Sequence, residues 1–217
     1  FIAFLLCSIV FFISFLFPVL QMLYWTIIFP KHLVDLKITE LFLNTILLVI
    51  LASSVLILFA FISNFGNRVT KSKFLNFLTT FSICGYAIPG VILAVAYISF
   101  VSWFDNNFIS FFEIKSIKSI FIGSIIGLVI VYFVRFYSLA SNGIKSGYHK
   151  INYSIDESSY LLGYSKLKTF LNIHVPYLKN SILLIGILIA IEIIKELPIT
   201  LILRPFNFET FATQAYI

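Results

Sequence analysis

The chain alternates between long apolar stretches and shorter polar segments. A helix that crosses the hydrocarbon core of a bilayer needs about 20 mainly apolar residues. Five stretches meet this requirement, at residues 2–29, 42–62, 78–101, 119–139 and 181–203. The pattern therefore predicts an all-α integral membrane protein with five transmembrane helices.

Proline and glycine interrupt several of these stretches. Pro18 lies in the first, and the segment 85–90 of the third contains a proline between glycines. We expect both helices to kink or unwind there, because proline removes a helical hydrogen bond. Gly123 and Gly127 have GxxxG spacing in the fourth stretch, which favours close helix contact. Ordinary packing is the preferred interpretation over dimerisation, since this short motif is common in membrane helices.

Composition supports the membrane class. The 217 residues are 60% hydrophobic and 11% charged, with a mean hydropathy of +1.05, whereas a soluble domain carries about 25% charged residues. This excludes a soluble nucleic-acid-binding protein, which the net charge of +6 would otherwise suggest. Cys7 and Cys84 lie inside apolar stretches, where small hydrophobic fillers are favoured over a disulfide or metal pair.

The ends of the chain suggest a larger protein. Phe1 lies within apolar sequence without the basic region of a signal peptide, and Ile217 follows soon after a polar turn. We therefore expect residues 1–217 to be a single transmembrane domain that is incomplete at both ends.

The basic residues are distributed unequally over the polar segments. Segments 63–77 and 140–180, with the adjacent Arg135, hold nine basic residues, and the segments on the opposite side hold five. Basic residues accumulate in cytoplasmic loops of membrane proteins. Segments 63–77 and 140–180 are therefore predicted to be cytoplasmic, with residue 1 starting on the same side.

The long polar segment 154–176 shows signals of internal structure. Ser154 and Glu157 have the spacing of a capping box, in which each side chain satisfies a free amide at a helix start. The helix that they open is predicted to run through Leu162 and to end at Gly163, because glycine suits a left-handed helix end.

A second short helix is predicted after this corner. Ser165 is a suitable cap for a helix over 166–174, which leads to Pro176 near the start of the fifth transmembrane helix. The two helices would present three larger side chains beside two small ones: Ile155, Tyr160 and Leu161 beside Ser158 and Ser159. The alternative is a connecting loop that lies on the lipid surface, which the lysines of this segment would also suit.

The spacing within this segment resembles a known motif. Glu157-Ser158-Ser159 is followed after three residues by Gly163, after nine more by Ile173, and then by Val175-Pro176. This order is similar to the EAA loop of ABC importer permeases, over 20 positions. The departures are serines where alanines are usual and valine in place of leucine, and all of them keep size and polarity close. The resemblance implies that residues 157–176 contact the ATPase of an importer.

Three further segments narrow the resemblance to ferric-iron-type permeases. They are Gly85-Tyr-Ala-Ile-Pro89-Gly90, Tyr132–Phe136, and Lys195–Leu201 continued by Arg204–Phe208. The likeness extends from about residue 12 to the end of the chain. It implies a MetI-like core of six helices, of which this chain holds five. By the same analogy the chain is most of one unit, the second of two in a fused polypeptide, without its last helix.

The resemblance also implies partners and a mode of action. A periplasmic solute-binding protein would deliver ferric iron, a cytoplasmic pair of ATP-binding subunits would supply the energy, and a second permease unit, fused or homodimeric, would complete the path through the lipid bilayer. The permease would be no enzyme and would need no cofactor. Alternatives are a permease of the same fold for thiamine, a polyamine or an oxyanion and, more remotely, a channel or an ion-gradient-driven transporter.

Motifs for nucleotide hydrolysis or metal binding are absent from the sequence, which is consistent with a permease. The sequence contains no GxxxxGK[ST] phosphate loop and no HExxH or CxxC metal motif. His32, His149 and His174 lie on different sides or in distant loops, so we expect no shared metal site.

Charged residues within the fifth stretch are candidates for the translocation path. Glu192, Lys195 and Glu196 lie inside it, where an unpaired charge costs about 2.5 kcal/mol or more. Glu192 and Lys195 have i,i+3 spacing for an ion pair, and Glu196 is predicted one turn from Glu192 on the same face. With Pro89 they are expected to line the path. The equal alternative is a structural ion pair near the outer end of a helix broken by Pro198.

Overall fold

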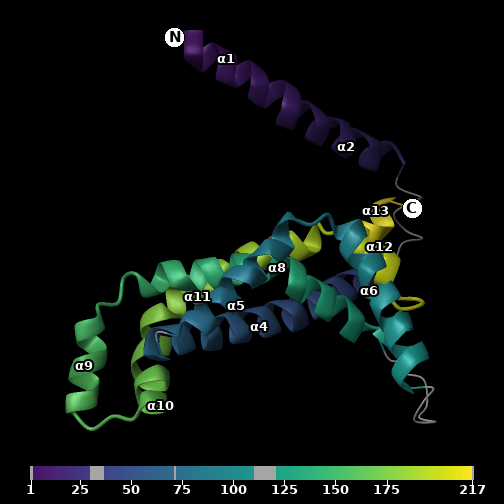
Figure 1. The fold of residues 1–217 in the computed structure, drawn as a ribbon. Coiled ribbons are helices and arrows are strands. Elements are labelled where there is room, and N and C mark those ends of the chain that lie inside the picture. Colours follow the sequence, from purple (N-terminus) through teal and green to yellow (C-terminus); the bar gives the residue numbers. More distant parts are fainter. Residues whose placement is uncertain (1, 30–36, 71, 110–120, 217) are drawn as a thin grey trace. The chain divides into compact units, whose positions relative to one another are not determined.

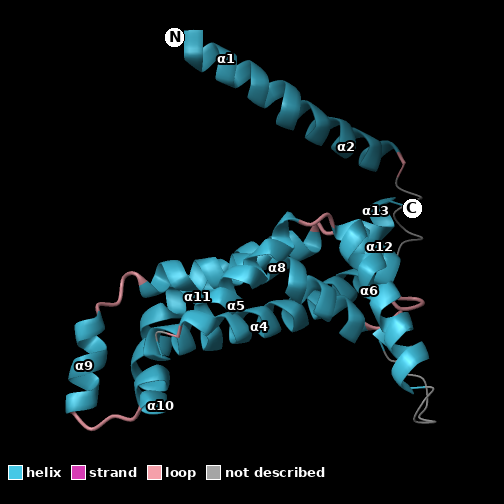
Figure 2. Ribbon diagram, viewed as in Figure 1, coloured by secondary structure: helices cyan, strands magenta, loops and turns pink. Residues whose placement is uncertain are grey.

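The computed structural model describes residues 2–29, 37–70, 72–109 and 121–216, and the regular structure in these ranges is entirely helical (Figures 1 and 2). Some residues of the charge count and of the fourth apolar stretch lie outside the described ranges: Lys31, His32, Asp35, Lys71, Glu113, Lys115, Lys118 and residues 119–120. The chain divides into two units, residues 1–40 and 41–217. The prediction of an all-α membrane protein is confirmed, with four helices long and apolar enough to span a bilayer and a fifth span if one bent pair is counted.

The first unit is dominated by one apolar helix. It comprises α1 (Ile2–Phe11), a π-helical turn η1 (Phe12–Leu16) and α2 (Phe17–Ile28). Pro18 occupies the first turn of α2, where its missing N–H leaves a carbonyl of the preceding turn without its usual donor. The wide π turn η1 lies directly before it, and the segment continues as one helix, Ile2–Ile28.

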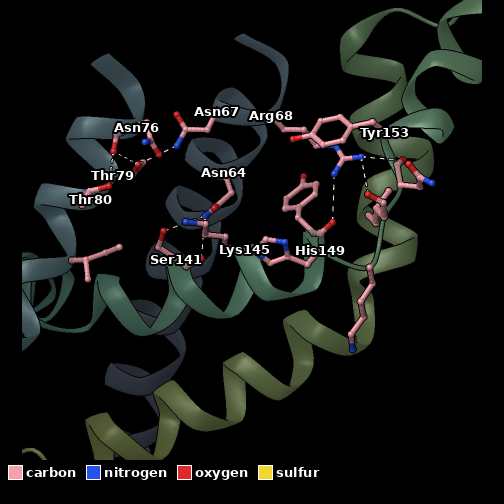
Figure 3. A pocket seen from close by; sticks show the side chains of 15 residues that line it. Asn64, Asn67, Arg68, Asn76, Thr79, Thr80, Ser141, Lys145, His149 and Tyr153 are labelled. Atoms are coloured by element: carbon pink, nitrogen blue, oxygen red, sulfur yellow. Dashed lines mark hydrogen bonds between the residues drawn. The ribbon is translucent and has the colours of Figure 1, made fainter. Parts of the chain in front are cut away.

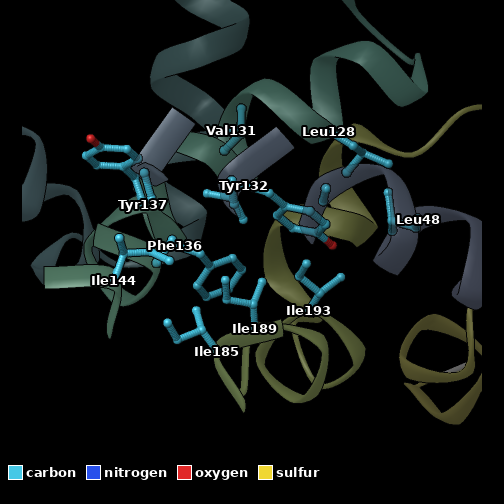
Figure 4. Packing of buried hydrophobic residues seen from close by; sticks show 14 of the residues in the cluster. Leu48, Leu128, Val131, Tyr132, Phe136, Tyr137, Ile144, Ile185, Ile189 and Ile193 are labelled. Carbon is cyan, nitrogen blue, oxygen red and sulfur yellow. The ribbon is translucent and has the colours of Figure 1, made fainter. Parts of the chain in front are cut away.

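Three long helices form the core of the second unit: α4 (Ile38–Thr70), α8 (Ile125–Tyr148) and α11 (Val175–Ile194). Figure 4 shows α8 side chains, among them Leu128 and Phe136, packed against Ile189 of α11 and Leu48 of α4. Both α4 and α8 continue well into the segments 63–77 and 140–180 that were expected to be loops. Those boundaries were wrong because a helix does not end where its apolar stretch ends.

The third apolar stretch is broken in the middle. It consists of α5 (Lys73–Ser82), the 3₁₀ turn η2 (Ile83–Ala87) and α6 (Gly90–Phe104), which is followed by the π turn η3 (Asp105–Ile109). The helices on either side of the break meet at an angle of 115°. The residue before a proline avoids helical geometry, and Ile88 is accordingly extended, with φ −84° and ψ 130°. The irregularity predicted at 85–90 is therefore confirmed.

Two glycines make close contacts with other segments. A Cβ on Gly85 would lie 2.1 Å from the carbonyl oxygen of Val134, so only glycine lets η2 approach α8. A Cβ on Gly127 would lie 2.1 Å from the carbonyl oxygen of Phe121. The GxxxG spacing does not place both glycines on one helix, because Gly123 has φ +68° and precedes α8, whose cap is Ser124.

The fifth stretch also differs from its prediction. A run of 29 helical residues, Lys166–Ile194, joins α10 (Lys166–Thr169), the π turn η5 (Phe170–His174) and α11. The predicted separate helix 166–174 is thus continuous with the transmembrane helix, since the wide turn η5 directly before Pro176 accommodates its missing N–H. The predicted end at 203 was also wrong. α11 ends at Ile194, and α12 (Pro198–Leu203) and α13 (Phe211–Tyr216) follow as separate short helices.

Candidate functional site

The segment that resembles the EAA loop begins with helix α9 (Tyr153–Leu161). Its cap is Asn152, whose side chain accepts a hydrogen bond from the amide of Ser154 at 3.4 Å. The predicted capping box of Ser154 and Glu157 is therefore wrong: the cap is Asn152, two residues earlier, and the helix begins at Tyr153. Glu157 instead lies exposed at the middle of the helix.

The corner after α9 agrees with its prediction. Gly163 has φ +82°, in the left-handed region that favours glycine, and its amide donates to the carbonyl of Tyr160 at 3.0 Å. The amide of Tyr164 donates to the carbonyl of Ser159 at 3.1 Å, which closes the helix end. Ser165 then caps the next helix by accepting from the amide of Lys168 at 3.3 Å. The chain thus reverses between α9 and α10 with its backbone groups satisfied.

The inner side of this corner is held by a buried carboxylate. Asp156 accepts from Arg68 Nε at 2.6 Å through one oxygen, and its other oxygen lies 2.9 Å from Nε2 of His174. The side chains of Arg68, Asp156 and His174 are 6%, 10% and 1% exposed. One ionic group therefore joins the end of α4, the middle of α9 and the turn that leads into α11.

Arg68 also holds the backbone that leads into α9. Its Nη2 donates to the carbonyls of Ile151 at 3.0 Å and Asn152 at 3.1 Å, and its guanidinium lies 4.3 Å from the ring centre of Tyr153. Figure 3 shows Arg68 beside Tyr153 at the edge of a polar hollow. A planar group with five donors can serve carboxylate, carbonyls and ring together, which lysine cannot.

Two further sets of contacts hold the segment that follows the corner, one to α9 and one to α4. Ser159 and Thr169, both buried, are hydrogen-bonded through their hydroxyls at 2.9 Å. The ring of Phe170 packs on Phe61 and Phe65 of α4, with centroid separations of 4.9 and 4.6 Å. The corner is therefore bonded to the long helices that follow and precede it in the second unit.

The outer side of the corner is apolar and exposed. Leu161, Leu162 and Leu167 are 89%, 78% and 66% exposed. Beside them a hollow of about 400 Å³ is lined by Ser154, Ile155, Ser158, Ser159, Leu162, Tyr164, Asn172 and Ile173. Of the predicted contact residues, Ser158, Ser159 and Ile173 thus meet in one hollow, and Gly163 forms the adjoining turn. Pro176 lies apart from the hollow, in the first turn of α11.

A second hollow, of about 490 Å³, lies between α4, α5 and α8 (Figure 3). Amides and hydroxyls bridge the helices around it, including Asn64 to Ser141 at 3.2 Å and Asn67 to Thr79 at 3.0 Å. Such polar contacts hold membrane helices together. Within the described ranges no three His, Cys, Asp or Glu side chains are grouped to hold a metal ion.

The candidate path residues fall into two sets. Lys195 Nζ lies 2.7 Å from Glu192 Oε1, so these two residues form an ion pair. Glu196 lies beyond the end of α11 and pairs instead with Arg135 of α8, at 3.3 Å. The expected common face of Glu192 and Glu196 is therefore wrong, because the helix stops before Glu196. That residue lies near Pro89, since a Cβ on the adjacent Gly90 would be 2.5 Å from its Oε1.

Comparison with known families agrees with this architecture. Residues 57–215 match the family described as the inner membrane component of binding-protein-dependent transport systems. The chain belongs to this family. It is thus a multi-pass inner-membrane permease of a transport system that works with ATP-binding and substrate-binding partners, and is not itself an enzyme. A search of curated proteins gave no significant match.

Sequence reasoning missed Arg68, Asp156, His174 and Arg135 as functional candidates. Arg68 and Asp156 are 88 residues apart, so no local pattern predicts their contact. One signal was available: Arg68 is the single arginine in a segment whose other basic residues are lysines. Arginine is preferred where several acceptors must be bound at once.

We predict that Asp156→Asn loosens the corner. Removing one partner of a buried ion pair costs about 3–5 kcal/mol, and the asparagine would leave the guanidinium of Arg68 without its charge partner. Hydrogen exchange of the amides in α9 should therefore accelerate in the purified protein. Glu157→Gln is the matched control, because this neighbouring carboxylate is exposed. Equal protection of α9 in both variants would contradict the role given to Asp156.

Proposed function

We propose that the chain is the permease of an ABC importer and that residues 154–176 dock onto its pair of cytoplasmic ATP-binding subunits. The observation that carries the proposal is the two-sided construction of this corner. Its outer side exposes Leu161 and Leu162, and contiguous exposed apolar surface marks protein interfaces. Its inner side is fixed by Asp156 to the membrane helices.

The docking surface combines apolar anchors with a recess. Leu161 and Leu162 project beside the hollow that Ser158, Ser159 and Ile173 line. A partner side chain entering this hollow would meet small hydroxyl groups on one wall and an aliphatic group on the other. Glu157, exposed at the middle of α9, adds a charge at the rim, where it contributes to orientation more than to affinity.

Movement of the ATP-binding subunits would pass to the membrane helices through the buried contacts. A displacement of α9 pulls on Asp156, which is bound to Arg68 of α4 and to His174 at the start of α11. His174 Nδ1 also lies 3.2 Å from the hydroxyl of Tyr148 at the end of α8. Closure of the ATP-binding pair would thus move the helices and switch the path between outward and inward access. ATP hydrolysis takes place on the partner.

We assign the corner and segments 63–77 and 140–180 to the cytoplasmic side. The contacts of Arg68 with Asp156 and with the carbonyl of Ile151 support one common side for both segments. The excess of basic residues, nine against five, supports the cytoplasm as that side.

We propose ferric iron, delivered by a periplasmic binding protein, as the cargo. The support is the resemblance of segments 85–90, 132–136 and 195–208 to ferric-iron-type permeases. A second permease unit, fused or homodimeric, would complete the path, which Glu192, Lys195, Glu196 and Pro89 are proposed to line. Three of these residues, Pro89, Lys195 and Glu196, lie at breaks in membrane helices, and broken helices form the substrate sites of many transporters.

The cargo is tested by isolating the full-length permease with its partners and identifying the ligand held by the binding protein. We expect ferric iron. A thiamine, polyamine or oxyanion ligand would refute the iron assignment and leave the importer intact, whereas a permease that co-purifies with no ATP-binding subunit would refute the importer.

We predict that Gly163→Pro weakens binding of the ATP-binding subunits and uncouples transport. Proline fixes φ near −65°, whereas this position has φ +82° and a bonded amide. Gly163→Asn is the control, because asparagine tolerates the left-handed region and a Cβ here would meet no atom within 4 Å. Pull-down of the ATP-binding subunits should fall with proline and persist with asparagine. Full binding and transport by the proline variant would contradict the docking of residues 154–176 onto the ATP-binding subunits.

We predict that the double variant Glu192→Gln/Glu196→Gln impairs uptake of the cargo and leaves assembly with the ATP-binding subunits intact. The substitutions keep the shapes of both side chains and remove the charges that would face the path. Uptake into cells and co-purification are measured side by side. Normal uptake would remove both glutamates from the path.

A further inference from the structure

Two helix breaks of the second unit meet at one side chain. Nη1 of Arg135, on α8, donates to the carbonyl of Ile88 at 2.8 Å, in the break between η2 and α6. Nε of the same guanidinium lies 3.3 Å from Oε2 of Glu196, in the break between α11 and α12. In Figure 1, α6 and α12 lie at one end of the second unit, and α9 and α10 lie at the other.

The contacts of Arg135 satisfy polar groups that the lipid of a membrane would leave unsatisfied. A broken helix leaves carbonyls without their helical donors, which lipid cannot satisfy. The side chains of Arg135 and Glu196 are only 20% and 8% exposed, and a charge in this setting needs a partner. Arg135 therefore satisfies one free carbonyl and neutralises one carboxylate at the same time.

The hydrogen bonding of this pair is incomplete. Within the described part of the chain, Glu196 Oε1 and Arg135 Nε are buried and form no hydrogen bond. Gly90 is the residue that leaves room for the group, since its Cβ would lie 2.5 Å from Glu196 Oε1 and 3.2 Å from Arg135 Nη1. Buried polar atoms without hydrogen bonds require an explanation in a native protein. Separation of Arg135 from Glu196 during a conformational change of the transporter is one explanation.

The remainder of the second break is held more completely. The hydroxyls of Tyr132 and Thr200 are hydrogen-bonded, and Thr200 Oγ1 donates to the carbonyl of Glu196 at 2.5 Å. The backbone at the start of α12 is thus fixed to α8, while the carboxylate of Glu196 is held by the charge of Arg135 and by a backbone hydrogen bond at Ile199. The ion pair between Glu196 and Nε of Arg135 has no hydrogen bond, so it is the contact in this break that is easiest to exchange.

We infer that Arg135 is a positioning residue of the transport cycle: its guanidinium ties both helix breaks to α8, and its contact with Glu196 is released in each cycle. The inference rests on the proposed importer function and goes beyond it, because it assigns the cycle a residue outside the candidate path residues. A contact that must be broken in each cycle slows the conformational change of the transporter when no binding protein is present. Its loss should therefore raise ATP hydrolysis that occurs without a binding protein.

The test measures this basal hydrolysis in nanodiscs that contain the full-length permease and its ATP-binding subunits. Arg135→Lys keeps the charge but replaces the two-armed planar fork by a single ammonium group. We expect this variant and Glu196→Gln each to raise the basal rate about tenfold, within the range of typical coupling between sites. Arg204→Lys is the matched control, because Arg204 pairs with Glu209 at 3.1 Å within one loop and ties no helix break.

Each outcome decides between roles. An unchanged or lowered basal rate of ATP hydrolysis in assembled Arg135→Lys complexes would contradict the positioning role of Arg135. Failure of both variants to assemble would also contradict it, because the pair would then have a purely structural role. A wild-type complex that hydrolyses no ATP would refute the importer function instead.

Discussion

The carboxylate of Asp156 is the constraint on which the cytoplasmic end of this permease depends. An ion in a buried site is costly, and its pairing energy seldom exceeds that cost by much. Such a group is therefore better understood as fixing geometry than as adding stability. Asp156 does so with both oxygens, since one binds Arg68 at the end of α4 and the other lies against His174 before α11. A neutral residue in its place could fill the space without specifying these partners.

The same logic recurs along α8. Tyr148, at its cytoplasmic end, contacts His174, and Arg135, nearer its middle, contacts both helix breaks. Between them lie buried apolar side chains of the core, among them the fully buried Phe136 and Ile144 (Figure 4). Helix α8 therefore connects the firmly bonded corner at residues 154–176 with an incompletely bonded pair of breaks. Force applied at the corner would reach the part of the unit whose polar contacts are easiest to exchange.

Local sequence signals predicted the local features of this fold well. Apolar length predicted the spans, Pro89 predicted the break before α6, and the corner at Gly163 and the cap at Ser165 lie where expected. The predicted helix boundaries were wrong where polar residues continue a helix beyond its apolar stretch, as at the end of α4. Hydropathy indicates which residues lie in the bilayer and does not indicate where the helical backbone ends. The partners of Asp156 and Glu196 could not be predicted, since those contacts depend on how distant helices pack.

The central claim is that the corner and the membrane helices move as one body. Spin labels on Ile62→Cys in α4 and Lys168→Cys in α10, both exposed, would measure this directly by electron–electron double resonance in the full transporter. Cys7 and Cys84 would be replaced by alanine. The account predicts the same distance distribution with and without ATP. A shift of several ångströms on ATP binding would show that the corner moves independently of α4 and would contradict it.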